Sequence, residues 1–491
     1  MGTTVQEMRL KNFIGGMWQA SQTDQVLPVP NPATGELLAE VPLSTAADVD
    51  RAVRAAREAF ESWREVPVVE RARVMFRWRE LLVQRVEELA RLVTTENGKT
   101  LDDARGEVWR GIEVVEFAAG MPTLMQGYVS PQVSRGIDME MVRYPVGVVA
   151  GIVPFNFPMM VPMWMMPIAL AAGNAFVLKP SERTPLTSMR LVELAMEAGI
   201  PEGVLNLVHG GKEVVDALLT HPGVDAVSFV GSQPVAEHVY RTAAAAGKRV
   251  QALAGAKNHH IVMPDANLEG AVHAIRNSGF GSAGQRCMAC SVVVAVGSVG
   301  DPLVEALVEA GDRMRIGNGL EEGVELGPLI RAEHRARVVE RIHQGLAEGA
   351  VMARDGRDAM ERLPQGFFLG PTILDRVNPE MTVAREELFA PVLSVIRADS
   401  LEEAIGVVNR SRFGNSAVIY TESGAAARMF RETVQAGMLG VNVGVPVPMA
   451  FFPFSGWKNS FYGDLHATGR DGVEFYTRKK MVTSRWFGGG R

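Results

Sequence analysis

Residues 146–179 read VGVVAGIVPFNFPMMVPMWMMPIALAAGNAFVLK and carry no charged side chain before Lys179. The stretch is not a membrane span, because four prolines interrupt it and a lipid-exposed helix must satisfy its own backbone hydrogen bonds. Its pattern predicts a buried strand over 147–153, a polar-tipped loop over 154–158, a packed helix, and a further strand over 175–178. A buried strand–helix–strand unit of this kind is typical of a parallel sheet.

The alternation of strands and helices continues to about residue 262. Short apolar strands with helices between them predict a parallel sheet covered on both faces, the architecture of many nucleotide-binding domains. A second α/β section is expected over about 267–443. Ahead of both, residues 13–18 and 37–41 are expected to form one hairpin, followed by a helix that starts at the capping box Thr45-Ala-Ala-Asp48.

The composition of the chain indicates an ordinary globular protein of several domains. A chain of 491 residues suffices for about two to four domains. Its hydrophobic content of 47% and charged content of 22% are ordinary for soluble globular proteins. The net charge of −6 argues against nucleic acid or an anionic membrane surface as a partner. Two cysteines and no N-terminal stretch of the signal-peptide kind indicate a reducing compartment, so a cytoplasmic location is expected.

Both cysteines lie in the stretch Gly279-Phe-Gly-Ser-Ala-Gly-Gln-Arg-Cys-Met-Ala-Cys-Ser291. Cys287 is the candidate nucleophile, because Arg286 beside it favours a thiolate and the small residues let backbone amides approach a reacting oxygen. An inert buried cysteine is the alternative, and such cysteines are common. The CxxC spacing of Cys287 and Cys290 also permits a redox dithiol; a zinc site would need a second cysteine pair, which the chain lacks.

Two glycine motifs are better explained as local structure. Gly279, Gly281 and Gly284 have the spacing of a dinucleotide fingerprint, but a predicted helix precedes them where the fingerprint needs a strand. Asn97-Gly-Lys-Thr100 resembles the end of a phosphate loop. However, Val93 occupies the position of the first glycine, so a glycine-capped helix end is expected there.

A better cofactor site is distributed over two strand ends. Lys179-Pro-Ser-Glu182 follows one predicted strand, and Phe229-Val-Gly231-Ser232 ends another just before a helix. Ligands bind at the strand ends of parallel sheets, where glycine and serine present amides and a hydroxyl to a pyrophosphate. Lysine and glutamate suit ribose hydroxyls. Either segment alone is more often a solvated loop, so their joint placement is what indicates a dinucleotide.

The chain resembles the aldehyde dehydrogenase superfamily over essentially its whole length. In the family's order and spacing it has Pro154-Phe-Asn-Phe-Pro158, the two strand-end motifs, Gly284-Gln-Arg-Cys287, Glu387-Leu-Phe-Ala-Pro391 and Pro453-Phe-Ser-Gly456. Within the superfamily it looks most like the CoA-acylating methylmalonate-semialdehyde dehydrogenases. The segments that carry this closer resemblance are Asn156-Phe-Pro-Met-Met-Val-Pro162, Gly255-Ala-Lys-Asn-His259, Gln285-Arg-Cys-Met-Ala-Cys290 and Pro448-Met-Ala-Phe-Phe-Pro-Phe-Ser-Gly-Trp-Lys458.

The resemblance implies an α/β fold with four parts. These are a Rossmann-type NAD-binding domain (1–124 and 144–255), an α/β catalytic domain (256–455), a return segment (456–470) and a β oligomerisation arm (125–143 and 471–491). The sequence supports the arm independently, because an isolated two-stranded ribbon is marginal in water and needs a partner subunit to cover it. A dimer or, preferably, a homotetramer is expected.

The family's roles attach to particular residues. Cys287 would attack the aldehyde, while the side-chain amide of Asn156 and the Cys287 N–H would hold the oxyanion. The substrate carboxylate would be bound by Arg110 and Arg286. The charge of Glu182 would disfavour the 2′-phosphate of NADP. Residues implied for NAD are Lys179, Glu182 and Glu387 at ribose hydroxyls, Gly231 and Ser232 at the pyrophosphate, Phe389 near the nicotinamide ribose, and also Phe155 and Arg183.

One departure from the wider superfamily indicates the acyl acceptor. Hydrolytic members have Glu-Leu-Gly-Gly-Lys, whose glutamate activates water, whereas the aligned block here is Leu253-Ala-Gly-Ala-Lys257. Water is a poor nucleophile without a base, but the thiol of CoA attacks unaided as a thiolate. We therefore expect oxidation of malonate or methylmalonate semialdehyde, loss of carbon dioxide, and transfer of an acetyl or propionyl group to CoA. The alternative is CoA-independent hydrolysis with His259 or His260 as the base.

Overall fold

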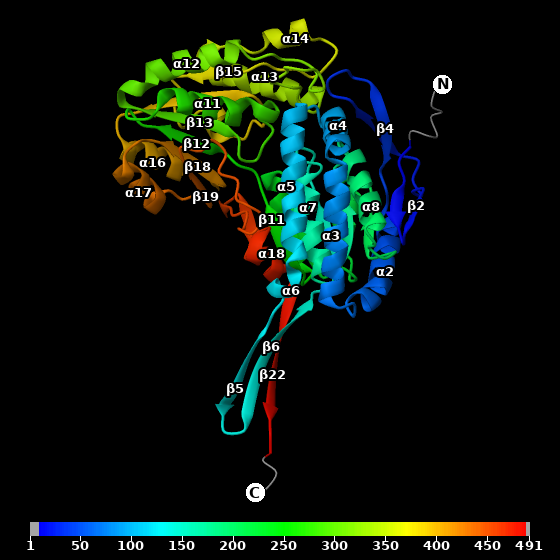
Figure 1. The fold of residues 1–491 in the computed structure, drawn as a ribbon. Coiled ribbons are helices and arrows are strands. Elements are labelled where there is room, and N and C mark those ends of the chain that lie inside the picture. Colours follow the sequence, from blue (N-terminus) through cyan, green and yellow to red (C-terminus); the bar gives the residue numbers. More distant parts are fainter. Residues whose placement is uncertain (1–8, 488–491) are drawn as a thin grey trace.

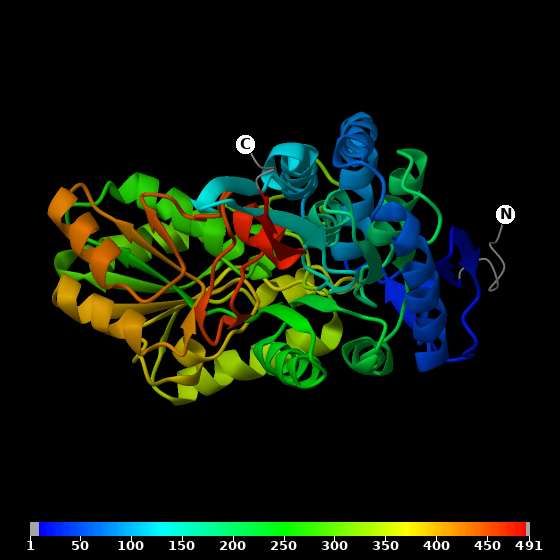
Figure 2. The ribbon, with the colours of Figure 1, turned by 90° about the horizontal axis from the view of Figure 1, so that it is seen from below.

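The computed structural model describes residues 9–487, which form two α/β units and a three-stranded sheet that projects from them (Figure 1). Residues 1–8 and 488–491, expected to begin the first domain and to end the arm, lie outside the described residues. Seen from below in Figure 2, the two units lie side by side, the first in blue to green and the second in green to orange. The α/β fold class that the sequence predicts is confirmed.

The first unit is built on an eight-stranded sheet in the order β2-β1-β9-β8-β7-β10-β11-β21. Its five central strands run parallel, and β1, β2 and β21 flank them in antiparallel pairings. The strands are β1 (Asn12–Ile14), β2 (Met17–Gln19), β7 (Val148–Ile152), β8 (Ala175–Lys179), β9 (Leu205–Leu207), β10 (Ala226–Val230), β11 (Arg249–Leu253) and β21 (Phe461–Gly463). The helices of this unit are α2 (Ala46–Trp63), α3 (Val68–Gln84), α4 (Val86–Asn97), α5 (Leu101–Ala119), α6 (Met121–Leu124), α7 (Met160–Ala171), α8 (Leu186–Glu197), α9 (Lys212–Thr220) and α10 (Gln233–Ala245).

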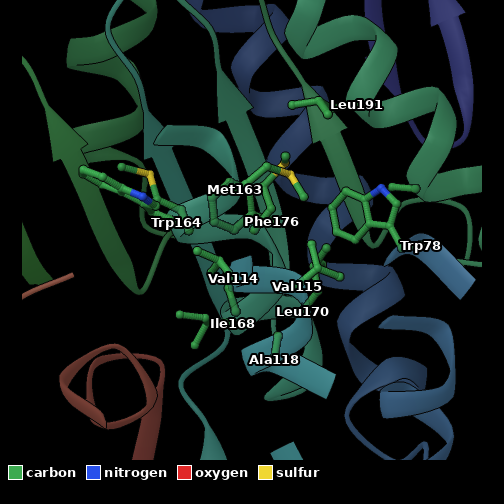
Figure 3. Close-up of a cluster of buried hydrophobic side chains, with 14 of the residues drawn as sticks. Trp78, Val114, Val115, Ala118, Met163, Trp164, Ile168, Leu170, Phe176 and Leu191 are labelled. Atoms are coloured by element: carbon green, nitrogen blue, oxygen red, sulfur yellow. The ribbon is translucent and has the colours of Figure 1, made fainter. Parts of the chain in front are cut away.

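The uncharged stretch 146–178, which contributes β7, α7 and β8 to this unit, folds as predicted. All five residues of β7 and all twelve of α7 are buried. Figure 3 shows Trp164 and Ile168 of α7 among side chains of α5 that include Val114 and Ala118. Burying one large apolar side chain contributes about 1.5–3 kcal/mol. The packed helix therefore fixes the end of the loop 154–158, which joins it to β7.

The second unit contains a seven-stranded sheet in the order β14-β15-β16-β13-β12-β18-β19. All neighbouring strands are parallel except β14, which pairs antiparallel with β15. The strands are β12 (Asn258–Val262), β13 (Cys290–Val296), β14 (Val351–Arg354), β15 (Thr372–Asp375), β16 (Val392–Ala398), β18 (Ser416–Tyr420) and β19 (Met438–Val441). Its helices are α11 (Leu268–Phe280), α12 (Gly300–Asp312), α13 (Ala332–Ala347), α14 (Asp358–Arg362), α15 (Thr382–Arg385), α16 (Leu401–Arg410) and α17 (Gly424–Thr433); β17 (Phe413–Gly414) pairs with β20 (Trp457–Lys458).

The projecting sheet joins the insert to the tail of the chain. Strand β6 (Ile137–Pro145) pairs antiparallel with β5 (Tyr128–Ser134) on one side and with β22 (Thr477–Arg485) on the other. All seven residues of β5 are exposed. The first residues of the expected arm segment 471–491 are helical: residues 471–475 belong to α18 (Gly469–Phe475), whose Val473 and Phe475 pack in the first core. The arm strand therefore begins at Thr477.

The single N-terminal hairpin expected from residues 13–18 and 37–41 is wrong. Two hairpins form instead, one from β1 and β2 and one from β3 (Val26–Pro30) and β4 (Leu37–Pro42). Prolines in β3 mask it in the sequence, because proline cannot donate to the strand ladder. The capping box at the start of α2 is confirmed, with the Thr45 N–H donating to the Asp48 carboxylate at 3.0 Å.

Candidate active site

A cavity of about 950 Å³ is lined by both α/β units. One wall consists of the carboxyl ends of β7, β8, β10 and β11, which is where open parallel sheets bind ligands. The other wall comes from the second unit and includes helix α13. The residues proposed from the sequence that line this cavity are Phe155, Asn156, Lys179, Glu182, Arg183, Gly231, Ser232, Cys287, Glu387 and Phe389.

Cys287 lies between a strained turn and strand β13. Three successive residues, Ser282, Ala283 and Gly284, have left-handed φ values of 50°, 53° and 66°. A Cβ on Gly284 would lie 2.2 Å from the carbonyl oxygen of Ala390, so only glycine fits there. Left-handed conformations cost energy at the other two residues and persist where the surroundings fix them. Because α11 precedes this turn, the glycines give backbone clearance and are not a dinucleotide fingerprint.

Two asparagine side chains hold the backbone of Cys287. Asn258 Nδ2 and Asn415 Nδ2 donate to the Cys287 carbonyl oxygen at 2.9 and 3.0 Å. Sequence reasoning assigned neither residue a role. Asn258 could have been found from the sequence, because it belongs to the segment Gly255-Ala-Lys-Asn-His259, one of the motifs that carry the family resemblance. Nothing in the sequence marks Asn415. Together they fix the peptide that carries the candidate nucleophile.

Arg286, which the sequence suggested as a charge that favours a thiolate and as a group for the substrate carboxylate, is held by side-chain and backbone partners in this structure. Its guanidinium forms an ion pair with Asp103 and donates to Ser282 Oγ at 3.2 Å and to the Asn277 carbonyl at 3.0 Å, and the residue does not line the cavity. Burial raises the pKa of the Cys287 thiol to about 12, and the nearby Glu387 charge adds to this rise. The charge of Arg286 acts in the opposite direction and lowers the pKa of Cys287, but its effect is smaller than that of burial. In this structure the guanidinium group is engaged by Asp103.

Asn156 reaches the cavity from the loop between β7 and α7. Its Nδ2 donates to the Gln285 carbonyl oxygen at 3.0 Å, and its backbone carbonyl accepts a hydrogen bond from Lys99 Nζ at 2.7 Å. Lys99 in turn forms a buried ion pair with Glu107 at 2.6 Å. A primary amide has two N–H donors, so one remains for an oxygen of a ligand.

Leu253 stands at the end of β11 and lines the cavity with Cys287. Its side chain is buried and offers no proton acceptor. The two histidines considered as substitute bases lie elsewhere, since neither lines the cavity. Burial lowers the pKa of His259 to about 4 and that of His260 to about 3, with neighbouring charges adding to the decrease. The structure therefore gives no support to a histidine base.

The strand-end wall has groups that suit the ribose and pyrophosphate of a dinucleotide. Lys179 Nζ lies 3.0 Å from Glu182 Oε2. Burial opposes ionisation of Glu182, but the charges of Lys179 and Arg183 and the hydrogen bonds to the carboxylate together outweigh it and lower the pKa of that carboxyl. Gly231 and Ser232 lead into α10, and the Ser232 side chain does not cap this helix. The uncapped N–H groups of the first turn are available to a phosphate.

Glu387 and Phe389 form part of the second wall. Glu387 Oε1 accepts a hydrogen bond from the Ala256 N–H at 3.0 Å, and burial raises the pKa of its carboxyl to about 7. Phe389 has a left-handed φ of 55°. Its ring meets that of Phe155 edge to face, with the ring centroids 5.9 Å apart. These two rings bring the first and second walls into contact.

Arg110 lies beside the cavity and does not line it. Its guanidinium pairs with Glu113 at 2.9 Å and is about one third exposed. The small pocket that contains Arg110 shares the side chains of Trp164 and Phe454 with the main cavity. The arginine therefore lies in a pocket that adjoins the main cavity at these two aromatic side chains.

The two cysteines have different surroundings. Both are free thiols, but Cys290 is buried in the core of the second unit, whereas Cys287 lines the cavity. Burial raises the pKa of Cys290 far above its usual range. The arrangement disfavours the dithiol alternative. Within residues 9–487, no group of three or more His, Cys, Asp and Glu side chains is placed to hold a metal ion, and no helix is both long and apolar enough to cross a membrane.

Curated proteins share most of this sequence. Malonate-semialdehyde dehydrogenase 2 of Geobacillus thermodenitrificans is 65% identical over 476 residues, which cover 97% of this chain and 99% of that protein. The malonate-semialdehyde dehydrogenase of Halalkalibacterium halodurans is 62% identical over 479 residues, covering 97% of this chain and 98% of that protein.

Solved structures share the fold. The crystal structure of methylmalonate-semialdehyde dehydrogenase from Oceanimonas doudoroffii matches with a TM-score of 0.96 at 47% identity, covering 98% of this chain and 99% of that one. A Sinorhizobium meliloti protein crystallised with NAD matches with the same TM-score at 46% identity and covers 98% of each chain. The sequence model of the aldehyde dehydrogenase family matches residues 18–482. This match confirms the resemblance that the motifs indicated. The chain belongs to the aldehyde dehydrogenase family.

Proposed function

We propose that this enzyme oxidises malonate semialdehyde or its methyl derivative with NAD and passes the resulting acyl group, after loss of carbon dioxide, to CoA. This proposal rests on the observation that the buried side chain of Leu253 lines the same cavity as Cys287. Hydrolytic members of the family have a glutamate at this position. With leucine there, no group at that position activates water, so the acceptor is a nucleophile that needs no base, such as a thiol.

Cys287 Sγ attacks the aldehyde carbon. The oxyanion that forms accepts hydrogen bonds from the second Nδ2 hydrogen of Asn156 and from the Cys287 backbone N–H, and each such donor lowers the barrier by about 3 kcal/mol. Because the pKa of Cys287 is raised, its proton needs an acceptor, and the Glu387 carboxyl with its pKa of about 7 is a suitable one in the same cavity. Loss of hydride from the tetrahedral adduct leaves a thioacyl group on Cys287.

NAD, when bound, supplies the acceptor for that hydride. The groups that would hold it are Lys179 and Glu182 at one ribose, Glu387 and Phe389 at the nicotinamide ribose, Gly231 and Ser232 at the pyrophosphate, and Phe155 and Arg183 alongside. The ionised carboxylate of Glu182 repels a 2′-phosphate, which favours NAD over NADP. The Sinorhizobium meliloti neighbour, crystallised with NAD, supports this choice.

The named relatives support a substrate that is both an aldehyde and a carboxylic acid. Arg110 and Arg286 are our candidates for its carboxylate, which would replace Glu113 and Asp103 as the partners of the two guanidinium groups. Once the aldehyde is oxidised, the thioacyl carbonyl lies β to the carboxylate and accepts its electrons as carbon dioxide leaves. The enolate that forms takes up a proton from water at carbon and becomes the acetyl or propionyl thioester of Cys287. We further propose that the enzyme is cytoplasmic and that the sheet of β5, β6 and β22 joins subunits into a homotetramer.

Hydrolysis is the second candidate, because the Glu387 carboxyl lines the cavity with a pKa suited to activating water. NADH formation from malonate semialdehyde, methylmalonate semialdehyde and propanal, each with and without CoA, separates the two functions. We expect rapid turnover and acetyl-CoA or propionyl-CoA only with CoA, and the slowest reaction with propanal, which lacks a carboxylate. Equal rates and free acid with and without CoA would establish hydrolysis and refute the proposal.

A further inference from the structure

The cavity is positively charged although the chain is not. Seven lysines and arginines line it against four carboxylates, whereas the whole chain has a formal net charge of −6. Lys179, Lys212 and Arg341 form ion pairs with cavity carboxylates. Such an excess of positive charge favours a ligand with several negative groups. Within the described part of the chain, the lining cations without a carboxylate partner are Arg183, Arg331, Arg337 and Arg412.

Two of these arginines stand on helix α13, in the wall opposite the strand ends. Arg331 is the N-cap of the helix, and Arg337 follows His334 at the spacing of one helical turn, so that all three line the cavity. Over this length the helix extends about 9 Å. The result is a row of two guanidinium groups along one side of the cavity.

His334 fixes the position of the second arginine. Its Nε2 lies 2.8 Å from the Phe389 carbonyl oxygen, which can only accept, so Nε2 carries the hydrogen. Nδ1 is then free to accept from Arg337 Nη2 at 3.1 Å. Burial lowers the pKa of His334, which keeps the ring neutral in this arrangement. Arg337 is thereby connected to Phe389, at the nicotinamide end of the proposed cofactor site.

None of the groups assigned to NAD above is Arg331 or Arg337. The pyrophosphate of NAD is assigned to Gly231 and Ser232 at the start of α10, and its ribose to Lys179 and Glu182, all on the strand-end wall. NAD has two phosphate groups, whose charge its nicotinamide cation partly offsets. CoA has three phosphate groups and no cation, and planar guanidinium groups bind phosphates through paired hydrogen bonds.

We propose that Arg331 and Arg337 bind the phosphate groups of CoA, which lies along α13 with its thiol directed past Phe389 toward Cys287. This inference rests on the function proposed above and adds the site at which the acyl acceptor is held. In the transfer step the CoA sulfur bonds to the acyl carbon, Cys287 Sγ leaves, and the proton that the CoA thiol gives up is balanced by the one that Cys287 takes up. Arg331 and Arg337 hold the acceptor in place and do not react.

Isothermal titration calorimetry of the full chain with CoA, without aldehyde or NAD, tests this site by binding alone. Arg337→Gln and Arg331→Gln should each raise the Kd for CoA about tenfold or more, the scale of one charge-assisted hydrogen bond. Arg337→Lys keeps the charge and should recover part of the affinity. The Kd for NAD, measured on the same samples, should change less than about threefold, which also shows that the variants are folded.

Arg428→Gln is the matched control. It removes the same charge from α17 outside the cavity, where Arg428 pairs with Glu432 at 2.9 Å, and it should leave both Kd values unchanged. Dephospho-CoA, which lacks the 3′-phosphate, should bind the wild type more weakly than CoA does, and at least one of the two glutamine variants should lose this preference.

Three results would overturn the inference: an unchanged Kd for CoA, an equal loss of NAD affinity, or a preference for CoA over dephospho-CoA that persists in both glutamine variants. An equal loss of NAD affinity would assign the arginines to the dinucleotide. If the variants bind CoA normally and the wild type still forms acyl-CoA, only this inference fails. If the wild type neither binds CoA nor needs it, the proposed function fails as well.

Discussion

Replacing Asn156 by alanine should lower the pre-steady-state rate constant for NADH formation about 100- to 1,000-fold. The structure sets this magnitude. Asn156 Nδ2 already donates one hydrogen bond to the Gln285 carbonyl, so a single N–H remains for the oxyanion, and the residue is only 6% exposed, which leaves little room for water to substitute. Loss of one preorganised donor in such a site costs about 2.7–4 kcal/mol of transition-state stabilisation.

The assay is pre-steady-state NADH formation at saturating NAD and semialdehyde, so that chemistry is separated from product release. Asn156→Asp keeps the shape of the side chain without its N–H donors and should be similarly impaired. Thermal unfolding is the control, because alanine also leaves the buried Gln285 carbonyl without this donor, at a cost of about 1–3 kcal/mol of stability. A folded alanine variant whose pre-steady-state rate constant lies within tenfold of the wild-type value would refute the assignment of Asn156.

Three further predictions concern the surroundings of Cys287. Leu253→Glu should create CoA-independent release of free acid, measured by product analysis without CoA; an NADH burst with no free acid would show that a base at this position is not what hydrolysis lacks. Because burial raises the pKa of Cys287 to about 12, its alkylation by iodoacetamide in the enzyme alone should accelerate about tenfold per pH unit from pH 7 to 10, and a plateau in this range would contradict that pKa. Asp103→Asn removes the carboxylate that pairs with Arg286 and should lower the free energy of unfolding in urea by about 3 kcal/mol, whereas an unchanged midpoint would show that the pair is not structural.

The sequence predicted those parts of the site that depend on local pattern. Lys179 and Gly231 each follow a run of apolar residues, and parallel strands bring their carboxyl ends to one edge, so their proximity could be inferred without coordinates. The uncharged stretch around α7 was interpretable for the same reason, since proline spacing and apolar content are local properties. The importance of Leu253 was inferred from aligning residues 253–257 with the Glu-Leu-Gly-Gly-Lys motif of the hydrolytic family members.

What the sequence missed depends on distant contacts. Arg286 adjoins the nucleophile, but Asp103, far away in the chain, engages its side chain, and no local pattern marks that pairing. Asn415 reaches the Cys287 carbonyl from β17–β18, again with no signal in its own neighbourhood. The positive row on α13 was overlooked because Arg331 and Arg337 resemble ordinary charges of a surface helix until the fold turns that face toward the cavity.

The central claim is that Cys287 carries an acyl group that only a thiol removes rapidly. Mixing the enzyme with NAD and methylmalonate semialdehyde in the absence of CoA, and following both NADH absorbance and the mass of the Cys287 peptide, tests it most directly. We predict a burst of about one NADH per active site, an acyl adduct on Cys287 that persists, and its rapid loss as propionyl-CoA when CoA is added. Continuous NADH formation without CoA, or a burst with no adduct on Cys287, would contradict the claim.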